Sequence, residues 1–84
     1  MSAFTPHAEY HPDIDILYIY LRDAAIVRTR GLGPWRNVDL TADGNVVGVE
    51  FVNASDGVDL RGVPESSDVV QAMEAIGLSL PVIA

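Results

Sequence analysis

Residues 11 to 21, HPDIDILYIYL, carry apolar side chains at almost every position after a turn at Pro12. Successive side chains of a β-strand alternate between the two faces of its sheet. A strand over residues 14–21 therefore presents one face made of Ile14, Ile16, Tyr18 and Tyr20, and another made of Asp15, Leu17, Ile19 and Leu21. Both faces need to be covered, which is typical of a central strand buried on two sides.

Further strand patterns surround this segment. Residues 4–10 favour an opening strand, and His11-Pro12-Asp13 favours a turn because proline restricts its own backbone and that of the preceding residue. Residues 25–30 alternate in polarity, which favours a third strand before the break at residues 31–34. The chain therefore begins as a series of strands.

The clearest local signal is the hairpin VDLTADGNVVGVEF, in which Asp43-Gly44 suits the two positive-φ positions of a type I′ turn. A two-residue loop there pairs Leu40 with Val47, and further along it pairs Asp39 with Gly48 and Val38 with Val49. One face of the hairpin then carries Val38, Leu40, Val47, Val49 and Phe51, and the other carries Asn37, Asp39, Thr41, Gly48 and Glu50.

A helix is predicted over about residues 67–76, where Ser66 or Ser67 can cap its first turn and Asp68 suits the positive end of its dipole. Its apolar stripe consists of Val69, Val70, Met73 and Ile76. Gly77 is expected to end the helix in a Schellman motif, with Leu78 folding back on Met73. The apolar tail, residues 78–84, is expected to dock or to pair as an edge strand, because it contains Pro81.

The predicted fold class is α+β, an antiparallel β-meander of four or five strands followed by one C-terminal helix and a short tail strand. The 84 residues predict a single domain over 1–84, with a β-rich core at 3–53, the helix at 66–77 and the tail at 78–84. One helix covers one face of the sheet only. Either the sheet curls over its other face or a second copy of the chain covers it, and we favour the homodimer.

Charge and composition exclude several classes of function. The formal net charge of −7, with five arginines and no lysine, opposes direct binding of nucleic acid, because that binding depends on basic residues at phosphates. An acidic surface suits a basic protein partner or a cation, and it also serves solubility. Without cysteine there is no disulfide, thiol nucleophile or cysteine-bound zinc. The first ten residues lack a signal-peptide pattern and no apolar run is long enough to span a membrane, so we expect a cytoplasmic protein.

The segments YHPDIDILYIYL and NVDLTADGNVVGVEFVNAS resemble the family known as domain of unknown function 2283, a family of small bacterial proteins. The matching positions are Tyr10, Asp15, Leu17, Tyr18, Ile19, Asp39, Gly44, Val46, Gly48 and Glu50, whereas His11 departs from the usual acid. The resemblance covers about two thirds of the chain. It implies a compact β-rich domain and no established activity. The role it suggests is that of an antitoxin-like companion of a toxin.

Carboxylates provide the main candidate for chemistry. Asp15, Asp39 and Glu50, with Asp13 nearby, would form a metal or acid–base site if the strand at 14–21 lay beside the hairpin. The alternative is that these carboxylates accept hydrogen bonds within the fold or face water. His7 and His11 lack the spacing of a zinc pair, and Gly48 indicates either a bulge or a close approach. Arg28, Arg30 and Arg36 around GLGPW could bind an anion or pair with acids of the chain.

We therefore expect a small non-enzymatic protein without a cofactor, a homodimer that acts by binding another protein, for which a basic protein is suited by charge. The expected dimer or partner interface consists of Ile16, Tyr18, Tyr20 and Trp35. The alternative is a domain that binds a metal or small ligand through Asp15, Asp39 and Glu50. Neither expectation includes binding to nucleic acid or a membrane.

Overall fold

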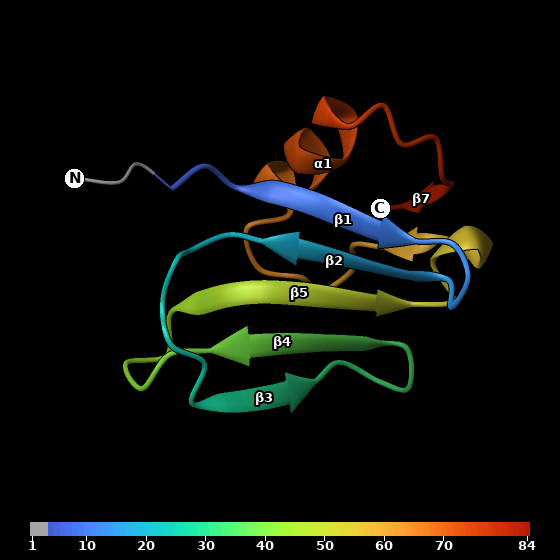
Figure 1. Ribbon diagram of the computed structural model, residues 1–84. Helices are drawn as coiled ribbons and strands as arrows, with labels where there is room; N and C mark the ends of the chain where they lie inside the picture. Colours follow the sequence, from blue (N-terminus) through green and yellow to red (C-terminus); the bar gives the residue numbers. More distant parts are fainter. Residues whose placement is uncertain (1–3) are drawn as a thin grey trace.

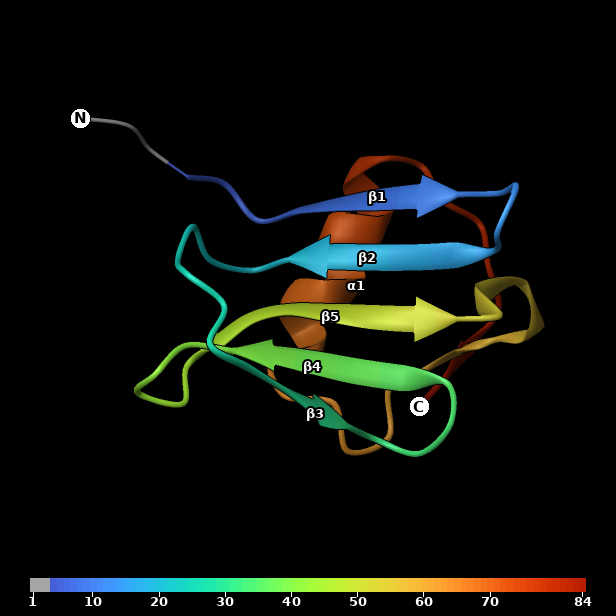
Figure 2. The ribbon, with the colours of Figure 1, turned by 60° about the horizontal axis from the view of Figure 1, so that its bottom comes forward.

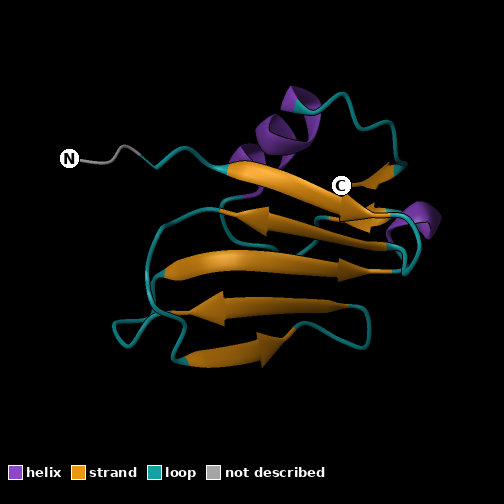
Figure 3. Cartoon of the chain, viewed as in Figure 1, coloured by secondary structure: helices purple, strands orange, loops and turns teal. Residues whose placement is uncertain are grey.

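The computed structural model describes residues 4–84, so the predicted start of the β-rich core at residue 3 lies outside the described residues. A five-stranded antiparallel sheet is covered on one face by helix α1 (Ser66–Ala75), and a short parallel strand pair lies near the C-terminal end (Figure 1, Figure 3). The predicted α+β class, four or five antiparallel strands followed by one C-terminal helix and a short tail strand, is confirmed with five strands in the main sheet.

The strands of the main sheet lie in the order β1-β2-β5-β4-β3. Their bounds are β1 His7–His11, β2 Ile16–Tyr20, β3 Arg28–Gly31, β4 Arg36–Leu40 and β5 Val46–Val52. The first three begin two or three residues later than predicted. For β2 the reason is that Asp15 has a left-handed backbone, with φ 54°, which a regular strand does not allow. The sheet is not the predicted meander, because the chain crosses from β2 to the far edge before β3, so that β5 lies between β2 and β4 and is paired on both sides.

The hairpin between β4 and β5 differs from the predicted type I′ turn. The Gly44 amide donates to the Thr41 carbonyl (3.0 Å) and the Thr41 amide to the Asn45 carbonyl (2.9 Å), and only Gly44 of the turn has a positive φ, 85°. Thr41 Oγ1 also accepts from the Asn45 amide at 3.0 Å, which stabilises this longer turn. The prediction of a two-residue loop is therefore wrong.

The longer turn shifts the first pairs of the hairpin. Leu40 lies opposite Val46 instead of Val47, and a bulge between Asp39 and Leu40 restores the predicted pairs of Asp39 with Gly48 and of Val38 with Val49. The pairing of Leu40 with Val47 was wrong because a turn closed by Thr41 leaves one extra residue in β5. Both Val46 and Val47 remain buried in spite of the bulge.

The core lies between the sheet and α1, which crosses behind β1, β2 and β5 in Figure 2. The most deeply buried side chains of the sheet come from alternate positions of the three central strands, namely Leu17, Ile19, Val38, Val49 and Phe51. Val69, Ala72 and Met73 of α1 pack against them, and Val58 of β6 (Val58–Asp59) joins the same core. The predicted division between two faces thus holds for residues 16–20, with α1 on the Leu17 face, whereas Ile14 and Asp15 lie in the turn before β2.

The two ends of α1 follow different rules. The N-cap is Glu65, with φ 53° and no side-chain cap, so the predicted capping by Ser66 or Ser67 is wrong. The Glu65 carboxylate instead bonds Arg22 at 2.8 Å. At the other end, Leu78 donates to the Met73 carbonyl (3.2 Å) and Gly77, with φ 66°, donates to Glu74 (3.0 Å), which confirms the Schellman motif.

The tail pairs as predicted. Strand β7 (Val82–Ile83) lies parallel to β6, with Val82 opposite Val58 and Ile83 opposite Asp59. Ile76, which was predicted on the apolar stripe of α1, follows the last helical residue and is 47% exposed. No helix in residues 4–84 has the length and apolar character needed to cross a membrane.

Candidate functional site

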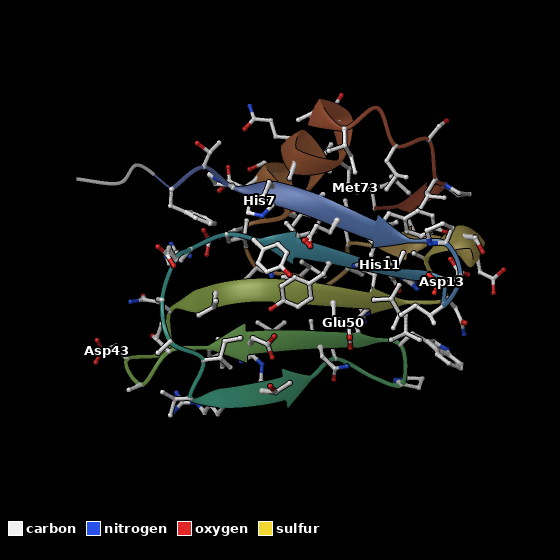
Figure 4. All side chains as sticks on the ribbon, viewed as in Figure 1. His7, His11, Asp13, Asp43, Glu50 and Met73 are labelled. Atoms are coloured by element: carbon white, nitrogen blue, oxygen red, sulfur yellow. The ribbon has the colours of Figure 1, made fainter. Side chains whose placement is uncertain are left out.

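The face of the main sheet that points away from α1 is covered by no element of the described chain, and we call it the open face. The strand register places on it His7, Glu9, His11, Ile16, Tyr18, Tyr20, Thr29, Asn37, Asp39, Gly48, Glu50 and Val52. Figure 4 labels His7 and His11 on β1 and Glu50 on β5. The polar groups and aromatic rings of the open face gather over the middle of the sheet, so we treat the open face as the candidate site.

Tyr18 and Asp39 form the centre of the open face. The Tyr18 hydroxyl donates to Asp39 Oδ2 and the Thr29 hydroxyl donates to Asp39 Oδ1, both at 2.5 Å. Burial, followed by the hydrogen bond to Asp39, raises the pKa of Tyr18 well above its usual value. The phenol therefore keeps its proton and acts as a donor, and Asp39 already accepts from two hydroxyl groups.

Gly48 makes the bond between Tyr18 and Asp39 possible. Tyr20 is the direct cross-strand neighbour of Gly48, and the ring of Tyr18 leans diagonally over the glycine to reach Asp39. A Cβ at Gly48 would lie 2.5 Å from Tyr18 Cε1, closer than two carbon atoms can approach. Of the two readings that the sequence left open for this glycine, a close approach is confirmed, and the bulge lies just before it.

The remaining polar groups of the open face also bind one another. Asn37 donates to Glu50 at 2.9 Å, and the Tyr20 hydroxyl lies 3.5 Å from Glu9. The His7 ring stacks on Tyr20, with ring centroids 4.7 Å apart, and burial followed by the nearby Glu9 charge raises the pKa of Tyr20. The aromatic rings and carboxylates of the open face therefore form a network in which the side chains bind one another.

One end of the open face is apolar. Ile16 lies opposite Val52, and the Val52 amide donates to the Trp35 carbonyl at 2.7 Å. The Trp35 side chain, in the loop between β3 and β4, is 54% exposed, and Ile14, in the turn before β2, is exposed as well. The four residues predicted as an interface, Ile16, Tyr18, Tyr20 and Trp35, thus belong to or adjoin the open face.

The predicted carboxylate trio is not brought together. Asp15 lies before β2 and accepts from Tyr10 (2.8 Å), the Ser55 hydroxyl (2.5 Å) and the Ser55 amide (2.9 Å). The donors, first Ser55 and then Tyr10, lower the pKa of Asp15. Asp15 therefore ties the turn between β1 and β2 to the short helix η1 (Ala54–Asp56), whereas Asp39 and Glu50 lie in the middle of the sheet. Within residues 4–84 no group of three His, Asp or Glu side chains is arranged to hold a metal ion.

The arginines predicted around GLGPW separate into two groups. Arg36 donates to the carbonyls of Asp59 (3.2 Å) and Arg61 on the side of the sheet that α1 covers. Arg28 and Arg30 lie on β3, opposite the buried Leu40 and Val38. All three arginines lie on the same face of the sheet, but only Arg36 forms an ion pair within the described residues, with Asp59 at 3.9 Å. The local pattern around GLGPW did not indicate this pair, because Asp59 follows β5 in the chain.

Two partners on the open face were missed from the sequence. Thr29 binds Asp39 because β3 pairs with β4 in the register Thr29–Asp39, and Asn37 binds Glu50 as its direct cross-strand neighbour. The second pair was already implied by the predicted hairpin register. The first required the pairing of β3 with β4, which the sequence pattern did not specify.

Comparison with known proteins identifies the family of this chain. The model of a family described as "Protein of unknown function (DUF2283)" matches residues 7–55, which is more than half of the chain. No curated protein and no solved structure matches the chain. The matched part contains β1 to β5 and the hydrogen bonds from Tyr18 to Asp39 and from Asn37 to Glu50. The chain therefore belongs to the DUF2283 family, proteins of unknown function.

Proposed function

We propose that this protein is a non-enzymatic binding protein and that its open face takes a basic protein partner. The observation that carries the proposal is a sheet face that combines Tyr18, Tyr20 and the adjoining Trp35 with three carboxylates and lies uncovered in the described chain. Aromatic rings supply contact area at low entropy cost and also attract cations.

The charges of the chain favour a basic partner. Glu9, Asp39 and Glu50 lie on the open face, whereas the ion pairs of the described residues involve Arg22, Arg36 and Arg61 and lie elsewhere, namely Arg22–Glu65, Arg36–Asp59 and Arg61–Asp59. A carboxylate that is buried at an interface needs a positive charge near it. A partner that covers this face has to supply that charge, and lysine or arginine side chains do so.

A second copy of the chain is the other occupant for this face, as in the homodimer expected from the sequence. The half-buried Ile16, Tyr18 and Tyr20 would provide its apolar contacts. Two open faces packed together would, however, set both groups of carboxylates against each other without an arginine between them, and like charges that meet at an interface are unfavourable. A basic protein is therefore the better-supported occupant.

The network of the open face argues for binding rather than catalysis. Tyr18 keeps its proton, Asp39 accepts two hydroxyl bonds and Glu50 accepts from Asn37, so these groups are occupied by one another. Such a surface is already ordered before a partner arrives, which lowers the entropy cost of association. We therefore assign the network to recognition.

The test uses isotope-labelled protein and a nona-arginine peptide, after light scattering on a dilution series has established the mass in solution. We expect a monomer whose open-face signals shift on titration, and weaker binding by the variant E9Q/E50Q. The variant D43N/E74Q changes the charge equally at exposed positions away from that face and serves as the control.

Equal binding by E9Q/E50Q and the control would show general charge attraction and would overturn the proposal. So would an absence of binding, or a stable dimer that dissociates when Tyr20 on the open face is replaced by glutamate. The last result would assign the open face to a second copy.

A further inference from the structure

We infer that the outer edge of β3 is a docking site for an extended acidic segment of another protein, which adds a strand to the sheet beside β3. This site is the edge of β3 and borders the open face at Thr29, but its two arginines project from the opposite side of the sheet. The inference rests on the exposure of β3, on two arginines and on the apolar residues that precede them.

Strand β3 is the least covered strand of the main sheet. It lies at the end of the strand order and pairs with β4 only, and all four of its residues are exposed. The other edge strand, β1, is packed against α1 and has Ala8 buried. In Figure 2, β3 lies at the edge farthest from β1, beyond the part of the sheet that α1 crosses. An edge strand of this kind offers main-chain donors and acceptors to an added strand.

Arg28 and Arg30 give the edge a positive charge within an acidic protein. Among residues 4–84, the arginines that form ion pairs or side-chain hydrogen bonds are Arg22, Arg36 and Arg61. Arg28 and Arg30 form neither within these residues. The two arginines lie two positions apart and therefore project from the same face of β3. An added strand with acidic residues at alternate positions would place its carboxylates next to them.

The same charges oppose pairing of β3 with a second copy of itself. In a two-fold antiparallel pairing centred on Thr29, Arg28 of each copy lies opposite Arg30 of the other, and like charges that are directly opposite destabilise a strand pair. An acidic segment reverses the sign of this interaction. Charge therefore selects an acidic partner over a copy of this chain.

Apolar contact area adjoins the edge. Ile26 and Val27, directly before β3, are 52% and 61% exposed, and the Val27 amide donates to the Leu40 carbonyl at 2.8 Å. The backbone of the segment before β3 is thus hydrogen-bonded to β4, while its side chains remain exposed to solvent. An added strand that alternates acidic and apolar residues can contact these side chains as well as the arginines.

The probe is a short capped peptide of alternating valine and glutamate, titrated into isotope-labelled protein while amide signals are recorded. We expect saturable shifts at residues 28–31 and at Val27. The same peptide with proline replacing two central valines should not bind, because proline cannot donate to a strand ladder. A peptide with lysine in place of glutamate should not bind either.

The matching protein variant is R28Q/R30Q, which should bind the glutamate peptide about tenfold more weakly. Its control, Q71E/S79E, has the same net charge through two exposed positions away from β3 and should bind as the parent does. Absence of saturable binding, equal binding of the proline or lysine peptide, shifts confined to β1, or unchanged affinity in R28Q/R30Q would each overturn the inference. The peptide comparisons use the parent protein and so do not depend on the folding of a variant.

Discussion

Gly48→Ala is the most informative single substitution in the sheet. A methyl group at this position would lie 2.5 Å from Tyr18 Cε1, so the ring has to move away from its place over β5. That movement weakens the bond from Tyr18 to Asp39, in which the acceptor is charged. The substitution thus combines overpacking with the partial loss of a hydrogen bond.

The expected magnitude follows from these two effects. Overpacking costs about 1 to 3 kcal/mol, and the loss of a hydrogen bond to a charged group costs about 1.5 to 3 kcal/mol when it is complete. Replacing glycine within a strand regains about 0.5 to 1 kcal/mol. We expect the free energy of unfolding to fall by about 2 kcal/mol, which lowers the melting temperature of a domain of this size by about 8 to 16 °C.

Urea unfolding monitored by circular dichroism measures this change, and Gly31→Ala is the matched control. Gly31 is also a strand glycine with an ordinary φ, but the nearest atom to its added Cβ is 3.8 Å away, so Gly31→Ala should not lower the free energy of unfolding and should raise it by up to about 1 kcal/mol. In a Tyr18→Ala background the cost of Gly48→Ala should disappear, because the three atoms nearest to the added methyl group all belong to the Tyr18 ring and its hydroxyl. A cost for Gly48→Ala that is the same with and without the Tyr18 ring would refute the reasoning.

Three further predictions concern other parts of the fold. Gly77→Ala should lower the free energy of unfolding by about 1 kcal/mol, measured in urea, because its φ of 66° is unfavourable for alanine, and Gly77→Asn should cost less. The pKa of Asp15 is lowered in the folded state, chiefly by Ser55, so its contribution is present above about pH 4 and is lost as the pH falls through the lowered pKa; stability measured against pH should therefore decline less in Asp15→Asn than in the parent. Mg²⁺, Mn²⁺, Ca²⁺ and Zn²⁺ should leave the melting temperature unchanged, because Asp15 is held apart from Asp39 and Glu50, and a rise with any of them would contradict this.

Much of the candidate site could be predicted from the sequence. The alternation in residues 14–21 placed Tyr18 and Tyr20 on the face opposite Leu17, and the hairpin pattern placed Asp39 and Glu50 on a common face. The pairing of β2 with β5 was not predictable from local patterns, because it joins segments on either side of a long excursion through β3 and β4. That pairing places Tyr18 and Tyr20 of β2 beside Glu50 and Gly48 of β5, with Tyr18 within reach of Asp39.

The sequence by itself determined the features that depend on periodicity and on single residues: two-faced β2, the amphipathic α1, and the helix end at Gly77. Only the tertiary structure decided the features that depend on competition between partners. Glu65, whose carboxylate binds Arg22, occupies the N-cap position of α1 in place of a serine, and Thr41 closes a longer turn than Asp43-Gly44 indicated. Asp15 lies in the turn and Asp39 on the open face because each carboxylate binds the donors that the folded chain brings nearest to it. Those donors come from distant parts of the chain and approach each carboxylate only when the chain has folded.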